Sequence, residues 1–172
     1  VFFTKTLSEE IGEYPKATRM YIPTLCNHCE DAPCERVCPT GATYTRTDGI
    51  VLVDKDKCIG CGSCIVACPY DQRTRLEPGM LEEGLFGNGK LTPFEEQGYK
   101  RWTVGTAVKC TFCNERVDAG LDPACVATCP TEARIFGDLD DPNSKVRRLI
   151  HERHGRQPMP EKNTNPKVFY ID

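Results

Sequence analysis

The chain has 172 residues, a formal net charge of −3 and a hydrophobic fraction of 39% that includes twelve cysteines. This length fits one compact domain or two very small ones. The charge argues against nucleic-acid binding, which needs a basic face, and no apolar stretch approaches the roughly 20 residues of a membrane-spanning helix. Because few aliphatic residues remain for a core, we expect bound metal to contribute much of the folding free energy.

The first cysteine group is CNHCEDAPCERVCP, residues 26–39. Its members are Cys26, Cys29, Cys34 and Cys38. The sequence that continues from it, CPTGATYTR, predicts a short β-strand, and Asp48-Gly49 is typical of a hairpin turn. Residues 50–53, IVLV, then predict a returning strand that leads to the next cysteines. This order of loop, strand, turn, strand and loop predicts a ferredoxin-like unit.

The second group, CIGCGSCIVACP, matches the spacing C-x2-C-x2-C-x3-C-P position for position, with Cys58, Cys61, Cys64 and Cys68. The third group has a longer excursion before its third cysteine, and its members are Cys110, Cys113, Cys125 and Cys129. It continues as CPTEARIFG, which predicts a short β-run like the one after the first group. All twelve cysteines therefore fall into three groups of four, each closed by Cys-Pro.

The rest of the chain is assigned around these groups. Residues 1–69 and 105–140 predict the ferredoxin-like core, and residues 70–104 predict a surface loop inserted into it. This loop is rich in Gly, Glu and Pro, and we expect Phe94 and Trp102 to anchor it; partner docking is the alternative role.

The C-terminal part predicts a helix followed by a tail. The helix is expected over residues 141–155, with Asp141 as its N-cap. The tail, residues 156–172, is polar and is expected to run extended over the surface, with its end packed on this domain or on a partner. His28 lies among the first cysteines, and we expect it to be exposed or to lie beside the ligands rather than among them.

Three uses of the cysteines compete. Disulfide scaffolds usually scatter their cysteines between loops, and structural zinc uses two C-x2-C hooks without a third cysteine three residues later. The second group has instead the run of [4Fe–4S] ligation, in which a loop presents three thiolates to one cluster and the cysteine before proline binds the other cluster of a pair. We therefore interpret the cysteines as ligands of [4Fe–4S] clusters, three by cysteine count.

The segments CNHCEDAPCERVCPTGA, DGIVLVDKDKCIGCGSCIVACPYD and KCTFCNERVDAGLDPACVATCPTEARIFGDLDDP resemble the electron-transfer subunits of membrane-bound molybdopterin oxidoreductases, such as dimethyl sulfoxide, polysulfide, thiosulfate, tetrathionate and arsenate reductases. The resemblance implies a small, loop-rich α+β fold of two fused ferredoxin-like halves. It implies two partners, a large molybdenum or tungsten catalytic subunit and a membrane anchor that reacts with quinone. Membrane association would then come through a partner, with the outer (periplasmic) face favoured over the cytoplasmic one.

The resemblance also implies how the cysteines share the clusters. One cluster would be held by Cys26, Cys29, Cys34 and Cys68. Its twin would be held by Cys58, Cys61, Cys64 and Cys38. The third site would take Cys110, Cys113 and Cys125, with either Cys129 or a cysteine of another group as the fourth ligand. Relatives carry a further group of four cysteines nearer the N-terminus. We therefore expect that this chain lacks that motif, and with it a fourth cluster of the full-length protein.

The expected function is a non-catalytic electron relay between the two partners. A free-standing polyferredoxin and a zinc-binding interaction module are the alternatives. An iron–sulfur enzyme would need an open iron position, which only the third site could offer, and only if Cys129 does not close it. Lys57 and Lys109 each precede the first cysteine of a group. They either tune the cluster potentials or are solvated charges, and the second interpretation is preferred. The motifs specify neither the substrate of the complex nor the direction of electron flow.

Overall fold

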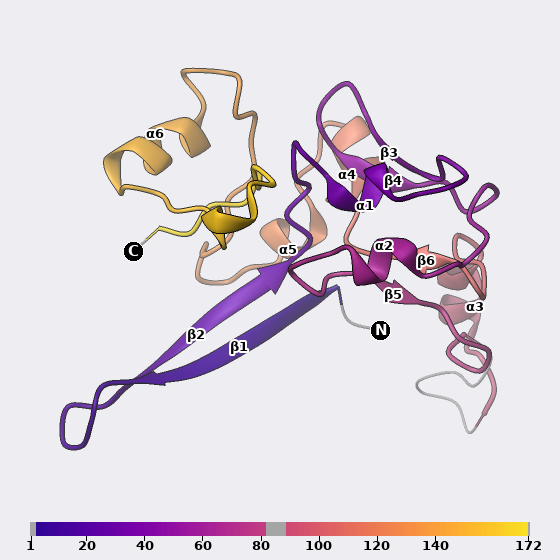
Figure 1. Ribbon diagram of the computed structural model, residues 1–172, viewed down its shortest axis with the longest axis horizontal. Coiled ribbons are helices and arrows are strands. Elements are labelled where there is room, and N and C mark those ends of the chain that lie inside the picture. The colour runs from indigo at the N-terminus through magenta and orange to yellow at the C-terminus, as the bar shows by residue number, and fades with distance from the viewer. Residues whose placement is uncertain (1–2, 82–88, 172) are drawn as a thin grey trace.

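The computed structural model describes residues 3–81 and 89–171, and in this part of the chain three separate pairs of antiparallel strands alternate with short helices (Figure 1). The strand pairs are β1 (Thr4–Ile11) with β2 (Thr18–Leu25), β3 (Thr43–Thr45) with β4 (Val51–Val53), and β5 (Thr74–Arg75) with β6 (Ala107–Val108). This is a small, loop-rich α+β architecture of the kind expected for a ferredoxin-type domain.

The helices are short, and four of them lie inside the cysteine groups. They are α1 (Pro33–Arg36), α2 (Ser63–Val66), α3 (Pro93–Tyr99), α4 (Asn114–Asp118), α5 (Ala124–Ala127), α6 (Lys145–Glu152) and the 3-10 helix η1 (Pro160–Lys162). Cys34, Cys64 and Cys125 belong to α1, α2 and α5, and α4 begins directly after Cys113. Within the described ranges, no helix has the length and apolar character needed to cross a membrane.

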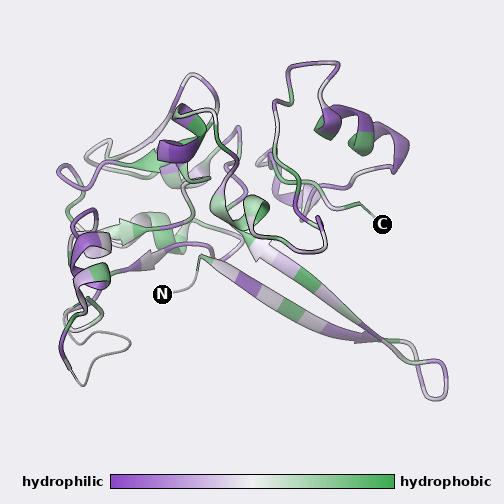
Figure 2. Ribbon diagram, turned by 180° about the vertical axis from the view of Figure 1, so that it is seen from behind, coloured by the Kyte–Doolittle hydropathy of each residue, from purple (hydrophilic) through white to green (hydrophobic). Residues whose placement is uncertain are grey.

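The strands β1 and β2 form a hairpin arm that projects from the body of the molecule (Figure 1). Their register runs from Thr4 opposite Leu25 to Ile11 opposite Thr18. Polar and apolar residues are mixed along both strands (Figure 2), and the side chains of Leu7 and Ile11 are exposed. The sequence pattern did not identify this arm, because the range that forms it was assigned to the ferredoxin-like core.

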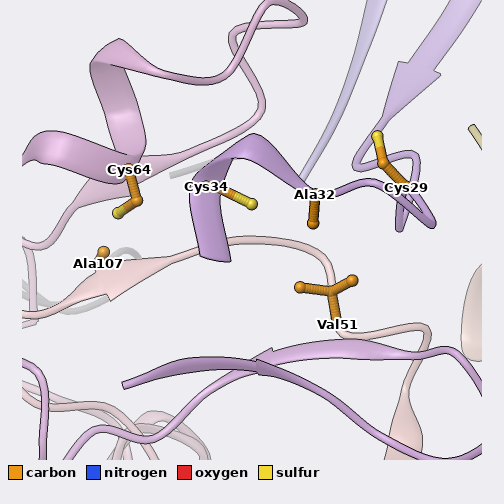
Figure 3. Close-up of a cluster of buried hydrophobic side chains, with 6 residues drawn as sticks. All are labelled: Cys29, Ala32, Cys34, Val51, Cys64 and Ala107. Atoms are coloured by element: carbon orange, nitrogen blue, oxygen red, sulfur yellow. The ribbon is translucent and has the colours of Figure 1, made fainter. Parts of the chain in front are cut away.

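The core is small and partly made of cysteine. Its buried cluster contains Cys29, Ala32, Cys34, Val51, Cys64 and Ala107 (Figure 3). Three of these six residues are cysteines, so the aliphatic core is as thin as the composition predicted. Two positive side chains, Arg73 and Lys109, are also buried, and a core with so little apolar area needs further sources of stability.

The elements after the first cysteine group lie as predicted, but those after the third do not. β3 and β4 are joined by the expected turn, in which the Asp48 carboxylate accepts the N–H of Ile50 at 3.1 Å and Gly49 has a φ of 80°. Residues 131–137, all of them described, contain no strand. The β-run predicted there is therefore wrong.

The insertion at residues 70–104 is more than a loop, because it contains β5 and α3. β5 pairs with β6, so the insertion begins and ends against the same part of the body. Phe94 is 86% exposed and does not anchor it. The Trp102 ring does make a contact, with the ring of Phe3 at a centroid distance of 5.4 Å.

The C-terminal helix is present but shorter than predicted. Ser144 is its N-cap and accepts the N–H of Arg147 at 3.3 Å, so α6 starts at Lys145. Asp141 instead accepts the N–H of Asn143 at 2.8 Å in the preceding turn. The helix prediction over residues 141–155 was wrong at its start. Asp141 and Ser144 can both cap a helix, and the structure uses Ser144.

The tail packs on this domain rather than extending away from it. The backbone of Arg156 pairs with that of Tyr170, whose hydroxyl donates to the carbonyl of Pro23 at 2.8 Å. Between them, the carbonyls of Thr164 and Asn165 accept N–H groups from the loop of the first cysteine group. The tail therefore covers that loop.

Candidate metal centre

Two hollows in the structure are lined by cysteines. Site one is lined by Cys26, Cys29, Cys34 and Cys68. Site two is lined by Cys38, Cys58, Cys61 and Cys64. Each hollow thus takes three cysteines from one group and the fourth from the other, and each set of four is the set that the resemblance implied for one cluster.

Two adjacent helices direct cysteines toward the different sites. Cys34 is on α1 and Cys64 is on α2. Figure 3 shows the Cys34 sulfur pointing toward the side of Cys29 and Ala32, whereas the Cys64 sulfur points toward Ala107. Both side chains are buried, so the two sites lie back to back across a small shared core.

The loop of the second group depends on glycine. Gly60 and Gly62 have φ values of 67° and 81°, in the left-handed region where glycine carries no steric cost. A Cβ at Gly60 would also lie 2.0 Å from the carbonyl oxygen of Gly105. This close approach holds the end of the insertion against the loop, where the N–H of Ala107 donates to Cys58 Sγ at 3.4 Å.

Hydrogen bonds at site two favour the thiolate, which is the metal-binding form of cysteine. The N–H of Thr43 donates to Cys38 Sγ at 3.4 Å. Burial raises the pKa of the Cys38 thiol, but donors from Thr43 and Thr40 outweigh this effect and bring the pKa to about 7. The hydroxyl of Ser63 lowers the pKa of Cys61 in the same way.

Site one is more deeply buried. Burial raises the pKa of the Cys29 thiol to about 11, and a hydrogen bond from the Thr164 hydroxyl of the tail opposes this rise. Burial also raises the pKa of Cys34, against the effect of Arg73. Four thiolates in such a place need compensating positive charge or metal, because a buried charge without a partner is costly.

Polar groups around site one supply part of that compensation and remain unsatisfied in the protein alone. Arg73 and Lys109 are 3% and 2% exposed. Among the described residues, the buried side-chain atoms without a hydrogen-bond partner are Asn27 Oδ1, His28 Nε2 and Arg73 Nη2, and all three residues line site one. His28 Nδ1 accepts the N–H of Val51 at 3.0 Å, which places the imidazole proton on Nε2. Two unpaired donors beside four cysteines fit an anionic cluster whose sulfur atoms accept hydrogen bonds.

The two lysines that precede cysteines lie in different environments. Lys57 is exposed and pairs with Asp54 at 3.4 Å, as its solvated interpretation predicted. For Lys109 that interpretation was wrong, because its ammonium is buried and donates to the carbonyls of Val51 and Cys110. His28 is likewise buried beside the ligands rather than exposed. Burial of these residues depends on contacts distant in sequence, which the motif does not encode.

The third group is arranged differently. Cys110, Cys113 and Cys125 are half-buried, and burial raises the pKa of Cys110 to about 11. The ring of Phe112 stacks on His28 at a centroid distance of 3.7 Å, which joins this group to the loop of site one. No sequence pattern predicts this stack. The only hint in the sequence is that each ring lies between the first two cysteines of its own group.

Cys129 has a local environment of its own. The hydroxyl of Thr131, and the N–H groups of Ala133 and Arg134, lower its pKa to about 7 against a smaller effect of burial. No other cysteine is among the groups that shift the pKa of Cys129 most, and the same is true of Cys38 at site two. In the described residues, no three Cys, His, Asp or Glu side chains converge closely enough to bind a single metal ion.

Comparison with known proteins identifies one family. The 4Fe–4S dicluster domain matches residues 17–82 and 89–139. A putative iron–sulfur subunit of dimethyl sulfoxide reductase from Halobacterium salinarum is 47% identical over 169 residues, which cover 94% of this chain and 61% of that protein. The iron–sulfur subunit of the arsenate respiratory reductase from a Shewanella species is 43% identical over 183 residues, which cover 93% of this chain and 78% of that protein.

A third relative, a tetrathionate reductase subunit from Salmonella typhimurium, is 40% identical over 158 residues, which cover 91% of this chain and 53% of that protein. The chain therefore spans between 53% and 78% of the length of these three relatives. All three names are those of subunits of reductases, and two of them specify an iron–sulfur subunit.

Proposed function

Because the chain belongs to the 4Fe–4S dicluster family, which includes iron–sulfur subunits of respiratory reductases, we propose that it relays single electrons between a molybdopterin catalytic subunit and a membrane subunit that reacts with quinone. The observation that carries the proposal is the pair of hollows in which two cysteine groups exchange their fourth cysteine. Such an exchange places two redox centres side by side, as a relay requires.

Sites one and two would each hold a [4Fe–4S] cluster through the four cysteines that line them. A [4Fe–4S] cluster takes up and releases one electron, at a potential that the protein sets through burial, charge and hydrogen bonds to sulfur. The chain supplies each of these: the donors of Thr43 and Ala107 at site two, and the buried Arg73 and Lys109 near site one.

The third site is proposed to use Cys110, Cys113 and Cys125 together with a cysteine from outside the three groups. The exchange of fourth cysteines between sites one and two supports this choice over closure by Cys129. Cys129 would then be the one ligand that this region contributes to another cluster, in the way that Cys38 serves site two.

The partners and the location are proposed from the relatives. Their names describe subunits of reductases, which supports a separate catalytic subunit for this chain. A quinone-reactive membrane anchor and a position on the outer face of the membrane follow from the resemblance of the cysteine groups to membrane-bound molybdopterin oxidoreductases.

The test is anaerobic purification of the full-length protein with whatever copurifies. We expect a brown complex with four iron and four sulfide atoms for each complete site, and a large subunit that contains molybdopterin. A colourless protein with stoichiometric zinc would refute the iron–sulfur assignment. A brown protein that remains monodisperse without a molybdopterin partner would instead favour a free-standing polyferredoxin.

A further inference from the structure

Arg73 is a buried cation placed between sites one and two. It lies just before β5 and is 3% exposed. Its side chain lines site one, and its Nη1 donates to Thr43 Oγ1 at 3.0 Å. The N–H of Thr43 in turn donates to Cys38 Sγ, a cysteine of site two. Arg73 thus contacts one site directly and the other through a single intervening residue.

The ionisable groups that act most strongly on Arg73 are cysteines from both sites. Burial lowers the pKa of its guanidinium, and these cysteines, with Cys34 of site one and Cys64 of site two foremost, together raise it. No carboxylate of the described residues forms an ion pair with it, and its Nη2 has no hydrogen-bond partner among them. Arg73 is therefore a buried cation whose closest ionisable neighbours are the cysteines that would bind the two clusters.

Charge at this position acts on reduction. An arginine stays protonated in proteins, and a cluster becomes more negative when it accepts an electron. A fixed positive charge nearby stabilises the reduced form more than the oxidised form, and it does so strongly where water is excluded. A cation shared by two sites therefore raises the potentials of both clusters.

We propose that Arg73 is a potential-setting residue shared by sites one and two, whose charge raises the midpoint potentials of both clusters together. The inference rests on the proposed binding of [4Fe–4S] clusters at these sites. It assigns to one side chain a common upward shift of two neighbouring redox centres, which leaves the step in potential between them unchanged.

The test is a potentiometric titration, followed by electron paramagnetic resonance, of the full-length protein in its complex. In Arg73→Gln, we expect the ratio of reduced to oxidised cluster at a fixed potential to fall about tenfold at both sites, which corresponds to a shift of about 59 mV for a one-electron couple. Arg73→Lys keeps the charge and should retain most of the wild-type potentials.

Arg75→Gln is the matched control. Arg75 lies two residues along the chain, and its Nη1 donates to the carbonyl of Gly60 in the loop of site two at 3.3 Å, but its side chain is exposed and already paired with Glu77 at 2.8 Å. Its removal should leave both potentials close to those of the wild type, since exposed charges are screened by solvent. A shift in Arg75→Gln as large as that in Arg73→Gln would mean that burial is not the cause, and would overturn the proposal.

The other outcomes also decide the matter. Unshifted potentials in Arg73→Gln with normal iron content, a shift at only one site, or an equal shift in Arg73→Lys would each overturn the shared-charge proposal. If Arg73→Gln fails to load clusters, Arg73→Lys decides: two clusters at wild-type potentials support the role of charge, and their loss indicates a requirement for shape alone. Absence of iron from the wild-type protein would instead refute the proposed function.

Discussion

The first two cysteine groups and the third use the same local motif with different results. Cys38 and Cys129 are both followed by Pro-Thr, and in both cases a threonine hydroxyl and backbone N–H groups bring the pKa of the thiol to about 7. Cys38 lines a hollow with three cysteines of another group, whereas Cys129 lines neither of the two hollows. The Cys-Pro-Thr segment stabilises a thiolate, but cysteines from a second group are needed to complete a cluster site.

The difference comes from the segment after the motif. Residues after Cys38 form β3, turn at Asp48-Gly49 and return as β4, which brings the second group beside the first. Residues 131–137 form no strand, and the chain leads instead toward α6. A short hairpin is therefore what converts two neighbouring loops into a pair of sites.

The largest expected effect comes from removing the two equivalent cysteines separately. Cys38→Ser should remove the cluster of site two, because that site loses one of four ligands. Cys129→Ser should leave the clusters of sites one and two intact. Iron content and electron paramagnetic resonance spectra measure both changes, and loss of either of these two clusters in Cys129→Ser would contradict the distinction between the regions.

A second pair of substitutions tests the exchange of cysteines within the first region. Cys68→Ser should remove the cluster of site one, although its neighbours in sequence serve site two. Cys61→Ser should remove the cluster of site two and interrupt the proposed relay. The two variants must therefore lose different spectroscopic signals, and loss of the same signal in both would show that each group closes its own site.

His28 connects the two regions, and its removal should have an intermediate effect. His28→Ala removes the stack on Phe112 and leaves the buried N–H of Val51 without an acceptor, which costs about 2 kcal/mol. For a domain of this size that lowers the thermal midpoint by about 4–8 °C. His151→Ala, at an exposed position, is the control and should change the midpoint little. Equal midpoints in the two variants would show that the stack does not join the regions.

The smallest effect is expected at the surface contact between the regions. Arg46, in the turn of the β3–β4 hairpin, donates to both carboxylate oxygens of Asp118 in α4, at 3.0 and 2.6 Å. Asp118 is exposed and Arg46 is partly exposed, so solvent screening keeps the contribution of the pair to stability small. Arg46→Ala should leave cluster content and the thermal midpoint unchanged at physiological salt. A clear fall in the midpoint would mean that this contact, rather than the buried stack, holds the third group in place.

Features set by neighbouring residues could be predicted from the sequence. The cysteine spacing predicted the groups and the cofactor, and Asp48-Gly49 predicted the turn between β3 and β4. The hairpin arm was missed because β1, TKTLSEEI, is mostly polar and shows no regular alternation of apolar and polar residues.

Features set by distant contacts could not be predicted. The interior position of Lys109 depends on the carbonyl of Val51, and that of Arg73 depends on Thr43. β5 pairs with β6 across the insertion, next to the close approach of Gly60 and Gly105. Each of these contacts joins segments that no local sequence pattern relates, so the burial of Lys109 and Arg73 could be seen only in the folded structure.

The tail, which covers site one, is synthesised after all the cysteines of that site. Thr164 is buried against site one, and its hydroxyl is 2.6 Å from that of Tyr70 and hydrogen-bonds to Cys29. The cysteines of site one have all been synthesised by residue 68, long before Thr164 emerges from the ribosome. Site one therefore remains open on this side throughout translation of the intervening chain, which leaves a period in which assembly factors can deliver iron and sulfide before the tail closes over it.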